Sequence, residues 1–126
     1  MNIIEHFVNG KKFSGDSKRT SKVFNPATGE QSADVKLASI KDMDTAVEAA
    51  KKAFVFWSKK PPLQRARVMF KFKELIEKNF EEITKIIVSE HGKVFDDAKG
   101  EVTRGLEVVE FACGIPQLLK GDFTEN

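Results

Sequence analysis

The chain has 126 residues, enough for one compact domain, and its hydrophobic fraction of 40% and charged fraction of 32% are typical of a folded protein rather than a disordered one. Its 21 Lys and Arg residues are interleaved with 19 Asp and Glu residues, which argues against nucleic acid as a partner. No basic leader with an apolar core opens the sequence, and no apolar run approaches the ~20 residues of a membrane span, so we expect a cytoplasmic protein without a membrane partner.

The first 40 residues are predicted to form strands and turns. Asn9 and Gly10 stand between apolar residues and favour a two-residue hairpin, because both tolerate the positive φ of a type I′ turn. A second turn is expected at residues 25–30, followed by period-two alternation over residues 33–37, which indicates a strand with one buried face. Two short hairpins are unstable alone in water, so this β-hairpin region (residues 1–40) must pack on something.

A helical region, residues 41–126, is predicted after it. Ser39 and Asp42 resemble a capping box, with Asp in the place usually taken by Glu. The helix that follows has apolar residues at every third or fourth position. These are Met43, Ala46, Val47, Ala50, Ala53, Phe54 and Trp57. The pattern predicts an amphipathic helix that ends near Trp57.

A second helix is predicted to begin at Pro61 and Pro62, since proline is tolerated in a first turn. Asn79, followed by Glu82, gives another cap signature, and a break or kink is expected there. Gly92 is typical of a left-handed residue that ends a helix.

The last helix is predicted to begin near Val94 or Phe95 and to end before Pro116. Its apolar stripe consists of Phe95, Ala98, Val102, Leu106, Val109 and Cys113. Arg104 and Phe111 lie on the opposite side at helical spacing. The sequence therefore predicts an α+β fold with two N-terminal β-hairpins and then about three helices, or four if Asn79 breaks the second.

The residues with reactive side chains have simple structural interpretations. Cys113 lies on the apolar stripe near a helix C-terminus, where the dipole disfavours a thiolate, so we interpret it as a small buried hydrophobe rather than a nucleophile. His91 ends a helix, where a cation favours the dipole, and a capping role is favoured over general-base catalysis. Lys93 follows the glycine and is expected to be solvated. One cysteine and two distant histidines provide no metal-site spacing.

Arg104 has two interpretations. In the first it is an exposed arginine that pairs with Glu101 and Glu107 at i±3, each pair being worth a few tenths of a kcal/mol. In the second it binds a ligand.

Four neighbours of Arg104 favour the second interpretation. Gly100 and Gly105 flank it inside the helix at a cost of ~1 kcal/mol each relative to Ala, which suggests close approach of another element or a ligand. Val108 and Phe111 share its side of the helix, which is unusual for a face that meets only water. This face is therefore predicted to border a cavity.

The whole chain resembles the N-terminal part of aldehyde dehydrogenases. The matching segments, in order, are residues 7–10 (F-V-N-G), 25–30 (N-P-A-T-G-E), the Ala-rich helix reaching Phe54 and Trp57, 62–67 (P-L-Q-R-A-R) and 90–93 (E-H-G-K). Residues 100–114 (G-E-V-T-R-G-L-E-V-V-E-F-A-C-G) are similar to the branch of CoA-acylating methylmalonate-semialdehyde dehydrogenases.

The resemblance implies an oxidoreductase of valine and inositol catabolism. In that branch a cysteine thiolate attacks the semialdehyde, hydride passes to NAD, and the acyl group reaches CoA with loss of CO2, giving propionyl-CoA or acetyl-CoA. The family's nucleophilic Cys, general-base Glu, oxyanion Asn and cofactor-binding glycines would all lie beyond residue 126. The chain is therefore expected to be a truncated part of the α/β, Rossmann-like cofactor domain, without catalytic, cofactor or metal residues, inactive alone and binding neither NAD nor CoA.

The resemblance also implies that Arg104, with Phe111 beside it, binds the substrate carboxylate, and that the enzyme is a homo-oligomer, a tetramer in the family. Two alternatives remain open at this point: another aldehyde dehydrogenase branch with a different substrate, and a small non-catalytic helical binding module.

Overall fold

The computed structural model describes residues 2–122, 124 and 125. The chain forms two compact units, residues 1–59 and 60–126, and the change from strands to helices at residue 40 lies inside the first unit. The fold is α+β, as predicted.

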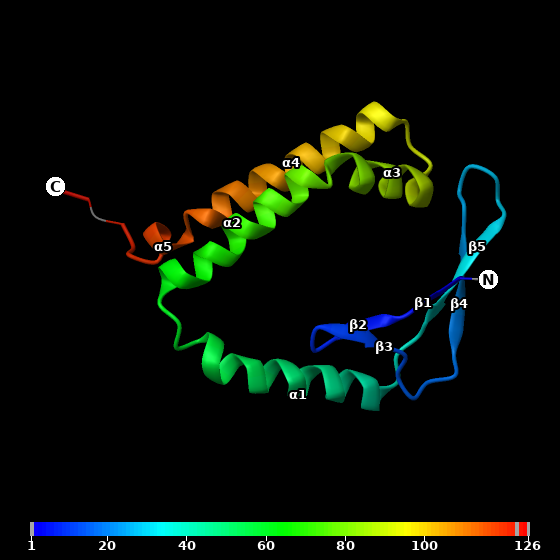
Figure 1. The fold of residues 1–126 in the computed structure, drawn as a ribbon, viewed down its shortest axis with the longest axis horizontal. Helices are drawn as coiled ribbons and strands as arrows, with labels where there is room; N and C mark the ends of the chain where they lie inside the picture. Colours follow the sequence, from blue (N-terminus) through cyan, green and yellow to red (C-terminus); the bar gives the residue numbers. More distant parts are fainter. Residues whose placement is uncertain (1, 123, 126) are drawn as a thin grey trace. The chain divides into compact units, whose positions relative to one another are not determined.

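The first unit contains a three-stranded sheet in the order β1-β5-β4 (Figure 1). β4 (Thr20–Phe24) and β5 (Gln31–Lys36) run antiparallel, with an irregularity between Val23 and Phe24. β1 (Asn2–Ile4) lies parallel to β5, a pairing that the sequence did not predict. Ala33 in the central strand is the buried residue of this sheet.

The two predicted turns are confirmed. β2 (His6–Val8) and β3 (Lys11–Phe13) form an antiparallel hairpin, in which Asn9 and Gly10 both have positive φ, 53° and 76°. Between β4 and β5, the Asn25 side chain accepts a 2.9 Å hydrogen bond from the Ala27 amide. Local backbone requirements therefore place both turns.

Helix α1 (Ile40–Trp57) begins with the predicted capping box. The Asp42 carboxylate accepts hydrogen bonds from the Ser39 amide and hydroxyl, each at 2.8 Å, and from the Asp16 amide at 2.7 Å. These hydrogen bonds, above all those from Ser39, lower the pKa of Asp42 to about 2. Asp42 is only 3% exposed, so it ties the loop before β4 to the start of α1.

The apolar face of α1 is present but remains exposed. Met43, Val47, Phe54 and Trp57 all retain a large part of their surface. The periodicity of the sequence thus predicted the helix correctly. It could not predict whether another part of the protein covers the apolar side.

The second unit is built of helices, with α2 (Pro62–Lys78) and α3 (Phe80–His91) packed against α4 (Phe95–Cys113) (Figure 1). The residues buried between them are small: Ala66, Thr84, Ala98, Val102 and Val109. Small side chains allow the helix backbones to approach closely. Gly92 ends α3 in the left-handed conformation, with φ of 79°, as predicted.

The structure differs from the prediction in two details. The break at Asn79 exists, but its side chain does not cap α3; the Asn79 Nδ2 donates to the Leu75 carbonyl at 2.7 Å and so closes α2. α4 does end before Pro116, as predicted, but Pro116 lies in the first turn of a short α5 (Ile115–Leu118), which was not predicted. Proline suits that position because a first turn needs no amide donor there.

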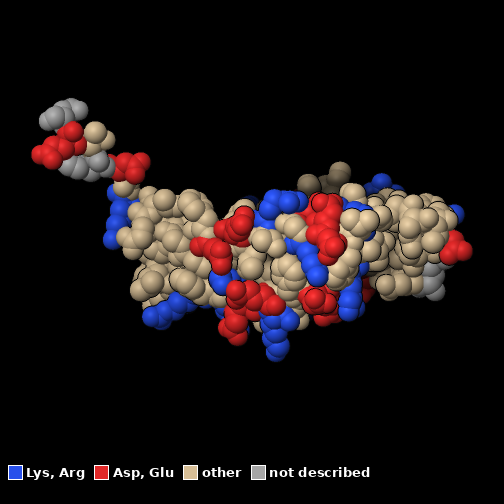
Figure 2. Space-filling model, turned by 90° about the horizontal axis from the view of Figure 1, so that it is seen from above, with Lys and Arg blue, Asp and Glu red and all other residues tan. Residues whose placement is uncertain are grey.

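Charged residues of both signs are mixed on the visible surface (Figure 2). On the face drawn in Figure 2, Lys and Arg are interspersed with Asp and Glu. Among the described residues, no helix has the length and apolar character needed to cross a bilayer.

Candidate functional site

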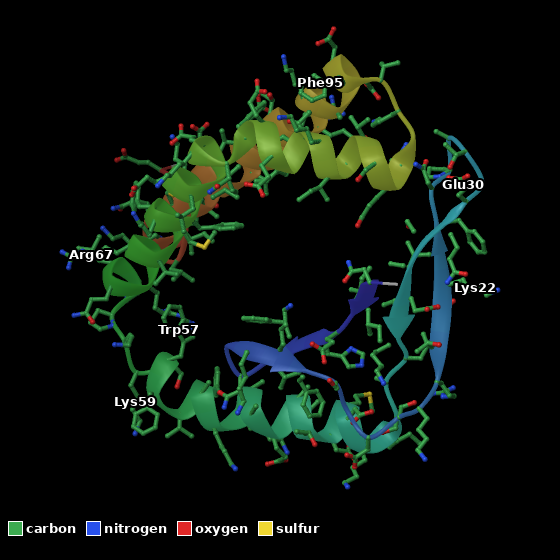
Figure 3. All side chains as sticks on the ribbon, turned by 45° about the vertical axis from the view of Figure 1, so that its right-hand side comes forward. Lys22, Glu30, Trp57, Lys59, Arg67 and Phe95 are labelled. Atoms are coloured by element: carbon green, nitrogen blue, oxygen red, sulfur yellow. The ribbon has the colours of Figure 1, made fainter. Side chains whose placement is uncertain are left out.

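Helix α4 carries the candidate site on the face opposite its buried side. Ala98, Val102 and Val109 face the other helices, as the predicted apolar stripe requires, and Leu106 and Cys113 are half-buried. The opposite face consists of Asp97, Glu101, Arg104, Val108 and Phe111, which recur at intervals of three or four. We call these five residues the outer face of α4. It begins two residues after Phe95, which lies at the N-terminal end of the helix (Figure 3).

Lys93 joins the acidic half of the outer face. Its Nζ lies 2.5 Å from the Asp97 carboxylate and forms a second ion pair with Glu101. The Lys93 side chain is only 12% exposed, so the expectation that it is solvated was wrong. The left-handed turn at Gly92 explains this, because it places Lys93 just before α4 with its side chain along the first turns.

These ion pairs change the proton affinities of the groups involved. Hydrogen bonds to Asp97 and Glu101 raise the pKa of Lys93. The hydrogen bond from Lys93 lowers the pKa of Asp97, with a smaller contribution from Arg104. Lys93 and Asp97 are therefore both charged near neutral pH.

Arg104 is exposed and forms neither of the ion pairs that helical spacing offered. Glu101 is paired with Lys93, and no cation of the described part of the chain lies within salt-bridge distance of Glu107. The guanidinium runs back along the helix, since its Nη1 lies 3.4 Å from where a Cβ on Gly100 would be. Gly100 thus provides room for the arginine. A Cβ on Gly105 would have no neighbour within 4 Å, so nothing in this unit approaches that glycine.

The apolar half of the outer face continues from Arg104. Val108 and Phe111 are each 67% exposed, as predicted from their helical position. A fixed cation beside an exposed apolar patch is suited to a small ligand that has a carboxylate at one end and a short carbon chain. The guanidinium can bind both carboxylate oxygens at once, which an ammonium cannot do with the same geometry.

The other candidate residues do not assemble into a catalytic group. His91 ends α3 next to the start of α4, whereas the free, half-buried Cys113 is the last residue of α4. At 1.5 Å per residue, the two ends of α4 are roughly 27 Å apart. No Cys–His pair forms, and the described residues contain no cluster of three potential metal ligands.

The first unit has an open groove of about 890 Å³ between the β2–β3 hairpin and α1. It is lined by apolar residues such as Val8, Phe13 and Phe56, mixed with Lys and Asp or Glu side chains. None of the predicted site residues lies there. The sequence analysis did not predict the ion pairs of Lys93, although the i+4 spacing between Lys93 and Asp97 was visible.

Comparison with known proteins identifies the class. The chain belongs to the aldehyde dehydrogenase family, whose sequence profile matches residues 13–126. This confirms the resemblance inferred from the ordered motifs.

Within that family, proteins similar to the chain include malonate- and methylmalonate-semialdehyde dehydrogenases. A malonate-semialdehyde dehydrogenase of Pseudomonas aeruginosa is 44% identical over 126 residues, covering 100% of this chain and 25% of that protein. The crystal structure of a putative methylmalonate-semialdehyde dehydrogenase from Sinorhizobium meliloti, complexed with NAD, matches with a TM-score of 0.93 and 50% identity over 99% of this chain and 26% of that one. A methylmalonate-semialdehyde dehydrogenase from Oceanimonas doudoroffii gives a TM-score of 0.92 and 50% identity, covering 100% and 26%. The chain thus spans about a quarter of the length of these relatives.

Proposed function

We propose that this chain is the N-terminal portion of an NAD-dependent, CoA-acylating dehydrogenase of malonate or methylmalonate semialdehyde, and that Arg104 binds the substrate carboxylate. The products would be acetyl-CoA or propionyl-CoA, CO2 and NADH. The observation that carries the substrate assignment is the exposed Arg104 guanidinium, which forms no ion pair with any described residue although Glu101 and Glu107 stand within one helical turn. Similarity along the whole chain to semialdehyde dehydrogenases supports the class of reaction.

The role of Arg104 follows from its chemistry. Arginine stays protonated at any physiological pH, and the semialdehyde carries an ionised carboxylate under the same conditions. Two parallel N–H···O bonds would fix the carboxylate end of the substrate and so orient its aldehyde end. Phe111 and Val108 would contact the carbon chain and exclude water from one side of it. The effect is binding and orientation, and no proton or hydride passes through these residues.

The described residues lack the glycine-rich turn that is typical of a dinucleotide site. The glycines at 92, 100, 105, 114 and 121 have no G-x-G-x-x-G spacing, and no glycine-rich turn leads from a strand of a parallel pair directly into a helix. We therefore derive no step through either cofactor and expect the 126-residue chain to be inactive alone. In the complete enzyme NAD would accept the hydride and CoA the acyl group.

The wider setting is also a proposal. We expect the complete enzyme to be a cytoplasmic homo-oligomer that acts in valine or inositol breakdown. Exposed side chains such as Phe7, Phe54 and Phe111 favour contact with further polypeptide, whereas a self-contained binding module would cover its apolar residues.

The test is a chimera in which residues 1–126 replace the matching N-terminal quarter of the Pseudomonas aeruginosa malonate-semialdehyde dehydrogenase. With Arg104→Leu, we expect kcat/KM for malonate semialdehyde to fall about 10- to 150-fold, the worth of hydrogen bonds to a charged group. The value for propanal, which has no carboxylate, should change less than about threefold, because the surface contribution of an arginine is small.

The matched control is Arg67→Leu, which removes an exposed arginine from α2 (Figure 3) and should leave both substrates unaffected. Arg104→Lys should recover only part of the loss, because an ammonium lacks the planar fork. An equal loss for both substrates would refute the carboxylate-binding role and favour another branch of the family.

A further inference from the structure

The ion pairs of Lys93 bear directly on the state of Arg104. Three carboxylates on α4 lie on the same side of the helix as Arg104: Asp97 seven residues before it, Glu101 three before and Glu107 three after. Two of the three, Asp97 and Glu101, are held by Lys93. Arg104 contributes to the electrostatic environment of Asp97 but does not reach ion-pair distance.

The position of Lys93 is unusual for a lysine at the start of a helix. A cation at a helix N-terminus opposes the macrodipole, and the first turn of α4 already has Asp96 and Asp97 to complement it. Even so, the Lys93 side chain is only 12% exposed and bridges two acids that lie about one helical turn apart, Asp97 and Glu101. Its contacts are therefore directed at the acidic half of the outer face rather than at the end of the helix.

We propose that Lys93 is a positioning residue that keeps Arg104 free for an incoming carboxylate, by holding Asp97 and Glu101 in ion pairs of their own. The proposal rests on the carboxylate-binding role of Arg104. Without Lys93, Glu101 takes the i,i+3 pairing with Arg104 that its spacing offers, and Asp97 adds a second negative charge near the same guanidinium. A substrate carboxylate then competes with two side-chain carboxylates for one cation.

The net charge around Arg104 also favours this role of Lys93. Lys93 and Arg104 carry two positive charges, and Asp97 and Glu101 carry two negative ones, so the group is neutral with its positive end at Arg104. Removing the Lys93 charge leaves the group with a net charge of about −1, which repels an anionic substrate at short range.

A simpler role for Lys93 makes a different prediction. If Lys93 served only to attach the α3–α4 loop to α4, removing the acids together with the lysine would leave the loop as loose as removing the lysine alone. If Lys93 instead keeps Arg104 free, removing both acids together with the lysine leaves the Arg104 guanidinium as accessible as in the parent chain. The triple variant Lys93→Met/Asp97→Asn/Glu101→Gln therefore separates the two roles.

The first measurement uses the 126-residue chain and reads Arg104 directly. Phenylglyoxal reacts with accessible guanidinium groups, and its rate at Arg104 can be followed by peptide mapping, with the exposed Arg67 as internal reference. Lys93→Met should slow modification of Arg104 about two- to fivefold relative to Arg67, as expected for a surface ion pair of up to about 1 kcal/mol. Lys93→Arg should keep the parent rate, and the triple variant should regain it. The slowing should shrink in about 1 M salt, which screens exposed charges.

The second measurement uses the chimera. Lys93→Met should raise KM for malonate semialdehyde about two- to fivefold, leave kcat nearly unchanged and leave propanal unaffected. The triple variant should return to the parent KM. A triple variant as impaired as Lys93→Met in both measurements, or an Arg104 rate that does not respond to Lys93→Met, would overturn the proposal. If Arg104→Leu fails to discriminate between the two aldehydes while the modification rates change as expected, the substrate role is wrong and the control of Arg104 by Lys93 is upheld.

Discussion

Replacing Gly15 by alanine tests how tightly the loop before β4 is fitted to α1. Gly15 has φ of +69°, a conformation that side chains rarely adopt. An added Cβ would also lie 2.8 Å from the carboxylate atoms of Asp42. That carboxylate cannot easily move, because it is buried and accepts hydrogen bonds from Ser39 and Asp16.

The magnitude follows from two separate costs. Holding an alanine at positive φ costs about 1–2 kcal/mol. Forcing a methyl group into occupied space costs about 1–3 kcal/mol more. Gly29→Ala is the matched control, since Gly29 has φ of +74° but nothing within 4 Å of its Cβ. Replacing glycine by alanine also lowers the conformational entropy of the unfolded chain. This effect is the same in both variants, so it cancels when they are compared. Gly15→Ala should therefore be less stable than Gly29→Ala by about 1–3 kcal/mol.

The assay is urea unfolding followed by the fluorescence of Trp57. This is the chain's single tryptophan, it ends α1, and both glycines lie in the same unit. Equal free energies of unfolding for the two variants would refute the reasoning, because it would mean that the loop yields to the methyl group without cost.

Two further predictions concern pH and packing. Because the folded pKa of Asp42 is about 2, below the ordinary value near 4, the stability that its carboxylate contributes is complete above about pH 4 and is lost as the pH falls toward 2. Asp42→Asn should remove this acid-dependent part of the stability. Acid titrations followed by Trp57 fluorescence would measure it. Val102→Ala should destabilise the helical unit by about 1.5–2.5 kcal/mol, because it removes two buried methyl groups. Val108→Ala, at an exposed position of the same helix, should change the stability by no more than about 0.5 kcal/mol. Urea unfolding followed by far-UV circular dichroism measures both. Equal effects at the two valines would contradict the assigned faces of α4.

Features that depend on neighbouring residues were predictable from the local residue types. The hairpin at Asn9 and Gly10, the capping box at Ser39 and the left-handed end at Gly92 were all predicted and are all present. Each depends on backbone angles and hydrogen bonds that span four residues or fewer, so the local residue types are sufficient. The two faces of α4 were predictable for the same reason, because helical spacing alone fixes which residues share a side.

Contacts between distant segments could not be predicted from the sequence and are defined by the folded chain. The parallel pairing of β1 with β5 joins residues about 30 positions apart, and the Asp16 amide reaches Asp42 across 26 positions. No local pattern specifies such partners, because many segments could pair equally well until the chain is folded. Arg104 shows the same limit over a shorter range. Its spacing offered Glu101 as a partner, but the turn at Gly92 brings Lys93 to that carboxylate first, and competition for one acid is resolved only in three dimensions.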